Sequence, residues 1–220
     1  MSTTRQSAER EDLFSRAEAF YEKHQKAISI AGGALLAIVI IIIGITNFYL
    51  PAQEKEAQEQ IFKAQLYFEK DSFNLALNGD ANYKGFLRIA TDYAWTKTGK
   101  LAHYYAGVCY LRLGEYDKAI EHLKKFNTSE PVVKAMTLGA LGDAYSETGE
   151  MEKAIKHYRK AATVARNEFI TPYYLFKAAL ALKASGQKEE ARKLFEELKY
   201  KYPDSNEGRE ASRYLAMLQG

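Results

Sequence analysis

The stretch LAHYYAGVCYLRLGEYDKAIEHLKKF, residues 101–126, decides the fold of this chain. Small residues stand at Gly107 and Ala119, and large apolar residues recur around them at helical spacing. Between the two lies Gly114-Glu115, where glycine can adopt the left-handed conformation that ends a helix. The stretch therefore predicts two helices joined by a tight turn.

The same pattern recurs twice downstream, at intervals of 35 and 37 residues. Five matched positions in three copies exceed what chance produces. The positions are Gly107, Tyr110, Gly114, Ala119 and Leu123, then Gly142, Tyr145, Gly149, Ala154 and Tyr158, and then Ala179, Leu182, Gly186, Ala191 and Phe195. We expect three helical hairpins over 98–204, with the glycine or alanine of each first helix facing the alanine of the second.

Weaker signals flank the three copies. Upstream, Phe86, Ile89 and Tyr93 have the same spacing as Phe195, Leu198 and Tyr202 of the last copy. They predict a degenerate first repeat over 51–97, whose first helix runs from Ala52 to Lys70 and whose insert lies around Asp71 to Asp80. Downstream, Asp204 and Glu207 have the spacing of a capping box and predict a C-terminal capping helix over 205–220. Pro131 and Pro203 are expected to end the second helices of their copies.

The N-terminal part of the chain carries a membrane signal. No charged residue occurs from Ala27 to Gln53, and Ile28 to Leu50 is almost wholly apolar. As a helix these residues extend roughly 35 Å, which exceeds a hydrocarbon core of about 30 Å. A cleaved signal peptide is the weaker interpretation, because the run is long, acids precede it and no cleavage site ends it. We predict an uncleaved transmembrane helix over 27–50.

Residues on either side of this run bear on its orientation and contacts. Four Lys or Arg residues precede it and three follow in a comparable stretch, which weakly favours a cytoplasmic N-terminus. In the segment 1–26, Leu13, Ala17, Phe20 or Tyr21, and His24 recur at helical spacing and predict an amphipathic helix, either a docking site or an extension of the anchor. Within the run, Gly33 and Ala37 form a small-residue pair on which another transmembrane helix can pack.

Composition excludes several classes of function. The single cysteine, Cys109, cannot supply a thiolate metal site, and 31 Lys plus Arg are nearly balanced by 28 Asp plus Glu, so no nucleic-acid surface is indicated. His122 and His157 occupy equivalent repeat positions, which explains their spacing without a metal. No catalytic or phosphate-binding motif occurs. We therefore expect no enzyme activity, no cofactor, no metal and no small-molecule substrate.

The hairpin pattern of residues 100–202 resembles the tetratricopeptide repeat, a helix-turn-helix unit with small residues at its eighth and twentieth positions. The resemblance implies an all-α solenoid, a right-handed superhelix with a concave face lined by the first helices. The superhelix either curls and buries these side chains itself or leaves a groove for an apolar partner segment. The groove residues that follow from the resemblance are Leu101, Tyr104, Val108, Leu111, Met136, Asp143, Tyr173, Phe176 and Leu180. They lack the lysines and asparagines of repeats that clamp a C-terminal carboxylate.

An apolar N-terminal run, a degenerate first repeat and the sequence from residue 73 to 126 together resemble the YfgM-like family of ancillary Sec translocon subunits. Membership implies a single-pass protein of the bacterial inner membrane with periplasmic repeats, and as partners the SecYEG channel, a PpiD-like chaperone and secreted clients. The alternative is a membrane-anchored adaptor for envelope assembly or cell division, for which the inverted topology, with repeats that face the cytoplasm, is also open.

Overall fold

The computed structural model describes the backbone of residues 2–219 and the side chains of 15, 16 and 18–218. Within these residues every regular element is helical and no strand occurs, so the all-α class predicted from the sequence is confirmed. The chain divides into two compact units, residues 1–52 and 53–220, and each is described by itself.

The first unit is helical throughout its described part. Helix α1 covers Ser2–Gly44 and a π-helical turn covers Ile45–Tyr49. The large apolar side chains from Phe20 to Tyr49 are mostly exposed, and Gly33 and Ala37 are exposed too. One helix of the described chain is long and apolar enough to cross a membrane. The side chains of Leu13 and Ala17, on which the amphipathic pattern partly depends, lie outside the described residues.

The expected helix start after Pro51 is wrong. Helix α2 covers Leu50–Glu69 and follows the π-helical turn directly, so Pro51 lies inside a run of consecutive helical residues. A proline ring clashes with the carbonyl four residues earlier and removes one N–H donor. The wider π turn, in which the N–H of Leu50 donates to the Ile45 carbonyl, lies directly before Pro51, where the proline ring would clash with an α-helical backbone. The Thr46 hydroxyl also donates to the Ile42 carbonyl, at 2.8 Å.

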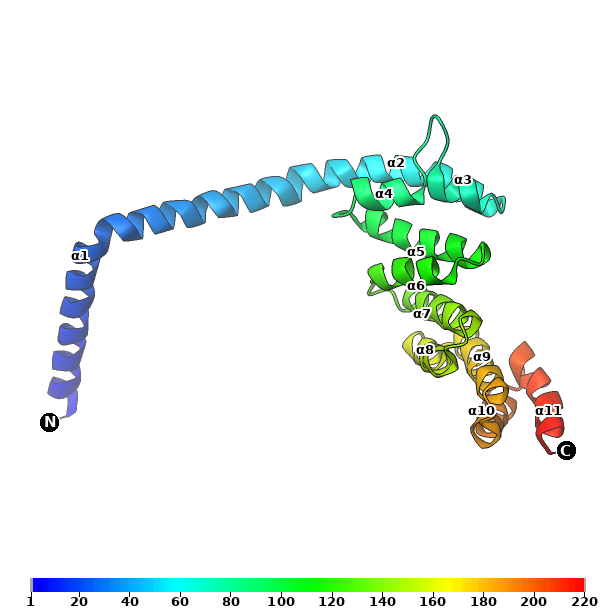
Figure 1. The fold of residues 1–220 in the computed structure, drawn as a ribbon. Coiled ribbons are helices and arrows are strands. Elements are labelled where there is room, and N and C mark those ends of the chain that lie inside the picture. The colour runs from blue at the N-terminus through cyan, green and yellow to red at the C-terminus, as the bar shows by residue number, and fades with distance from the viewer. Residues whose placement is uncertain (1, 220) are drawn as a thin grey trace. The chain divides into compact units, whose positions relative to one another are not determined.

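The second unit contains the predicted hairpins, stacked one after another (Figure 1). The first helices are α5 (Lys97–Arg112), α7 (Pro131–Glu147) and α9 (Ile170–Ala184); the second helices are α6 (Tyr116–Lys125), α8 (Met151–Val164) and α10 (Lys188–Lys201). One boundary differs from expectation, because Pro131 does not end α6. It is the first residue of α7, a position where the absent N–H would have no partner.

The three turn glycines have the predicted left-handed backbone. Gly114, Gly149 and Gly186 have φ of 77°, 79° and 81°. In each turn the following residue donates its N–H to the carbonyl five positions earlier, as Glu115 does to Tyr110 at 2.9 Å. This bond is the hallmark of the Schellman motif, which satisfies the last carbonyls of the first helix.

The small residues of the first helices make a closer contact than expected. The prediction set Gly107 opposite Ala119, but a Cβ on Gly107 would lie 2.6 Å from Cγ of Leu123. Likewise, a Cβ on Gly142 would lie 2.5 Å from the Tyr158 ring. Each glycine therefore makes room for the large side chain four residues after the alanine, because Leu123 and Tyr158 fill the hairpin core.

The degenerate repeat precedes α5, and its insert lies later than predicted. Asp71 is not part of the insert: its φ is 54°, and Ser72 donates to the Tyr67 carbonyl at 2.9 Å, as in the glycine turns. The second helix then begins as α3 (Phe73–Asn78) and resumes as α4 (Phe86–Asp92). Between them a short loop closes through a bridge from Gly79 to Lys84. The insert thus splits a second helix, and Phe86, Ile89 and Tyr93 are buried as predicted.

Helix α11 (Asn206–Gln219) follows the third hairpin. Its first turn is capped by Ser205 and not by Asp204, because the N–H of Gly208 donates to the Ser205 hydroxyl at 2.9 Å. Thr96 caps α5 in the same way, accepting from Gly99 at 2.8 Å. Helix α11 therefore corresponds to the first helix of a repeat, and Ala211 and Leu215 are buried against its neighbours.

Candidate functional site

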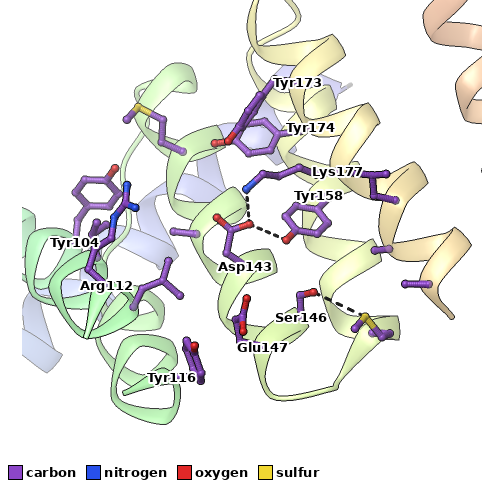
Figure 2. A pocket seen from close by; sticks show the side chains of 18 residues that line it. Tyr104, Arg112, Tyr116, Asp143, Ser146, Glu147, Tyr158, Tyr173, Tyr174 and Lys177 are labelled. Carbon is purple, nitrogen blue, oxygen red and sulfur yellow. Dashed lines mark hydrogen bonds and ion pairs between the residues drawn. The ribbon is translucent and has the colours of Figure 1, made fainter. Parts of the chain in front are cut away.

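The first helices of the three hairpins line a groove with a volume of about 680 Å³ (Figure 2). Helices α5, α7 and α9 supply most of its side chains, while α6 and α8 contribute at the edge. These helices lie beside one another because each hairpin packs on the next through its small and aromatic residues. The groove is open, and Met136 and Tyr173 are each 44% exposed in it.

Most of the residues predicted for this face lie in the groove. Leu101 and Phe176 do not line it; Phe176 instead packs edge-on against Phe195 and Tyr214, between α9, α10 and α11. The helix face that Phe176 occupies is covered by α11, which the repeat pattern alone does not position. The seven predicted residues that line the groove are Tyr104, Val108, Leu111, Met136, Asp143, Tyr173 and Leu180. Their part in binding stays a prediction.

A polar cluster crosses the groove from α7 to α9. Asp143 Oδ1 accepts hydrogen bonds from Lys177 Nζ at 2.7 Å and from the Tyr158 hydroxyl at 2.6 Å. The Lys177 ammonium also lies 5.2 Å from the centroid of the Tyr173 ring. Figure 2 shows the four side chains together, with Asp143 bonded to both Lys177 and Tyr158.

The protonation states of this cluster follow from its contacts. Burial alone lowers the pKa of Lys177, but its hydrogen bond to Asp143 and the charge of that carboxylate outweigh burial and raise it. Burial, together with the nearby Asp143 carboxylate, raises the pKa of Tyr158 above its ordinary value. Lys177 is therefore a cation and Tyr158 a neutral donor at physiological pH.

The charges in the groove fit a neutral or apolar partner better than a carboxylate. Lys177 is engaged by Asp143. The other basic side chain in the groove is Arg112, and Glu147 lies in the same groove with the opposite charge. A carboxylate clamp needs free cations that converge on one point. The groove instead offers aromatic and aliphatic side chains around a neutralised ion pair.

Sequence reasoning missed Lys177 and Tyr158 as groove residues, yet a signal was present. Lys177 lies 19 residues after Tyr158, and Tyr105 and Tyr214 lie 19 residues after Phe86 and Phe195. Those two aromatic pairs are stacked, with ring planes 11° apart in each. Alignment at that spacing marks Lys177 as the position where a charge replaces an aromatic ring.

Outside the groove, the described residues offer little other chemistry. Cys109 is buried, and burial raises the pKa of its thiol to about 12, so it is not a nucleophile at neutral pH. His103 of α5 and His122 of α6 contact each other in the first hairpin. Their Nδ1 atoms are 3.2 Å apart. Among the described residues, no group of three potential metal ligands comes together.

Three models of the tetratricopeptide repeat match the chain, at residues 101–126, 137–168 and 173–205. The chain carries tetratricopeptide repeats. Each matched range covers the parts of one hairpin, α5–α6, α7–α8 and α9–α10, so the repeat assignment agrees with the observed helices. A search of the curated proteins finds no match to the chain. Tetratricopeptide repeats are protein-interaction modules, and the groove lies on the face formed by their first helices.

Proposed function

We propose that this protein is a membrane-anchored tetratricopeptide scaffold that holds a protein partner at the Sec translocon. The observation that carries the proposal is the open groove between α5, α7 and α9, with exposed apolar and aromatic side chains at Met136 and Tyr173. Exposed apolar surface in a concave site marks a place where another chain is buried. The partner is a protein segment with an apolar face, a helix or an extended strand.

The N-terminal helix supports the membrane half of the proposal. Its exposed apolar side chains, Leu35 and Ile38 to Ile43 among them, have no core of their own to bury in. A lipid bilayer supplies the apolar environment that these side chains lack. Anchoring confines the repeats to the membrane surface and raises their effective concentration near a channel.

The Sec assignment rests on the resemblance to the YfgM-like family, with the repeats in the periplasm of a bacterium. In that setting the groove holds a membrane-anchored chaperone or an emerging secreted chain beside SecYEG. The neutral character of the groove agrees with such a partner, because the Lys177 charge is matched by Asp143. No reactive group of the cluster is needed, so the role is one of holding and positioning.

Site-specific photocrosslinking in cells tests the proposal. A photoreactive phenylalanine replaces Met136 or Tyr173 in the full chain, and we expect adducts with SecYEG or a membrane-anchored chaperone. Tyr200 of α10 is the matched control, because it is 75% exposed and does not line the groove. Adducts from Tyr200 alone, or from none of the three positions, would overturn the proposed function.

A further inference from the structure

We propose that Trp95 is a lipid contact, which seats the first repeat in the headgroup region of the membrane. The inference rests on the proposed membrane anchor and adds a second, independent attachment of the repeat domain to the bilayer. It concerns a single side chain: Trp95 is the only tryptophan of the chain and is 85% exposed.

The position of Trp95 within the repeat domain is fixed by polar contacts between α2 and the start of α5. The Glu54 carboxylate accepts hydrogen bonds from the backbone N–H of Lys97 at 2.8 Å and from the Thr98 hydroxyl at 2.7 Å. Burial raises the pKa of Glu54, but these hydrogen bonds outweigh burial and lower it, so the carboxylate is charged at neutral pH. Glu54 therefore caps α5 from another helix and holds the turn that carries Trp95.

A second contact fixes the other side of the same turn. The Tyr93 hydroxyl donates to Glu56 at 2.9 Å and accepts from Lys84 at 3.0 Å. Tyr93, two residues before Trp95, and Thr96, directly after it, are both buried. The exposure of Trp95 is thus a property of a well-held turn.

Chain length places this turn close to the apolar run. Glu54 lies four residues after Leu50, where the apolar run ends, and four residues of a helix advance about 6 Å along its axis. The headgroup region is roughly 5 to 8 Å deep on each side of the hydrocarbon core. If Leu50 lies at the edge of the core, Glu54 and the turn that it holds lie within the headgroup region.

The chemistry of the turn suits that region. An indole ring has a large apolar surface and one N–H donor, and tryptophan is enriched where membrane and water meet. Lys97 and Lys100 are exposed next to it, and lysines near a membrane surface attract anionic headgroups. A bilayer interface is therefore the occupant that these residues fit.

Fluorescence of the full chain in vesicles of phosphatidylcholine and phosphatidylglycerol tests the inference, because Trp95 is the sole tryptophan. We expect its emission to shift to shorter wavelength, to fall with lipids that carry a quencher near the headgroup, and to resist aqueous iodide. Quenchers at the ends of the lipid chains should have less effect. Emission that iodide quenches freely and labelled lipids leave unchanged would overturn the inference.

A matched control uses Phe169, which is 86% exposed in the turn before α9. In the double variant W95F/F169W the introduced tryptophan should be quenched by iodide and not by labelled lipid. Equal quenching of both positions by lipid would contradict a specific role for Trp95. If the chain stays in the vesicles after carbonate washing while Trp95 remains accessible to iodide, only the inference fails; loss of the chain in the wash would refute the proposed anchor and the inference together.

Discussion

Lys177 lies over the ring of Tyr158, with its ammonium nitrogen 5.7 Å from the ring centroid. At the junctions before α5 and before α11 an aromatic ring takes the place of the lysine, as Tyr214 does on Phe195 with centroids 5.0 Å apart. The junction between α8 and α9 thus carries a cation where those two junctions carry stacked rings. The Asp143 carboxylate balances the positive charge of Lys177 at this junction.

The first prediction concerns this ion pair. D143A leaves the Lys177 ammonium and the Tyr158 hydroxyl without their acceptor, and we expect a loss of about 1–3 kcal/mol in the free energy of unfolding. D143A/K177M should lose less, because the unmatched charge is gone. Glu147 is an exposed acid on the same helix, and E147A should change stability by less than about 0.5 kcal/mol. Thermal and denaturant unfolding of the full chain in detergent, followed by circular dichroism, measures all three; a double variant as unstable as D143A would refute the account.

A second prediction compares two turns that share one backbone conformation. Asp71 has φ of 54° and Gly149 has φ of 79°, and a Cβ on Gly149 would meet no atom within 4 Å. G149A therefore tests backbone strain alone and should cost about 1 kcal/mol, while D71G should leave stability unchanged or raise it by up to about 1 kcal/mol. The same unfolding measurement applies. A stabilising G149A would mean that the left-handed turn is not required.

A third prediction concerns pH. Burial lowers the pKa of His103, and the neighbouring His122 lowers it further; burial also lowers the pKa of His122. A histidine with a lowered pKa in the folded state binds fewer protons than in the unfolded state. Stability is therefore fully present above the ordinary pKa of 6.5 and is lost as pH falls below it.

Unfolding of the full chain at pH 7.5 and 5.5 measures this effect. We expect the wild-type chain to be less stable at the lower pH, and H103Q/H122Q to show a smaller decrease between the two, because two groups that must take up protons are gone. The remaining decrease belongs in part to His157, whose pKa burial also lowers. An identical decrease in the double variant would show that the pair does not titrate in this range.

Much of the fold follows from a few residues of the sequence. The residue in the left-handed turn that ends a helix is usually glycine, so Gly114, Gly149 and Gly186 mark the hairpins directly. Asp71 adopts the same conformation without being glycine, which is why the first repeat is harder to place and its insert is misjudged. The spacing of Asp204 to Glu207 predicts the cap of α11 at Asp204, but the side-chain oxygen that accepts from the N–H of Gly208 belongs to Ser205, one residue later.

The groove is less readable than the fold. Position in the repeat predicts that Tyr104 and Tyr173 face inward, and both line the groove. It cannot predict that α11 covers Phe176, because that depends on packing against Tyr214. Apolar patterning does not identify Lys177 either. A charged residue on an inner face is stabilised by a partner on another helix, here Asp143, and the pattern of one helix does not show that partner.

Co-purification from gently solubilised membranes tests the central claim most directly. We predict that M136S/Y173A, which removes two exposed groove side chains, loses the SecYEG or chaperone subunits that purify with the wild-type chain. Y200A, which alters an exposed tyrosine that does not line the groove, should retain them. Circular dichroism must show that both variants keep the wild-type helix content. Equal recovery of these subunits with M136S/Y173A and with the wild-type chain, or their absence from the wild-type preparation, would contradict the account.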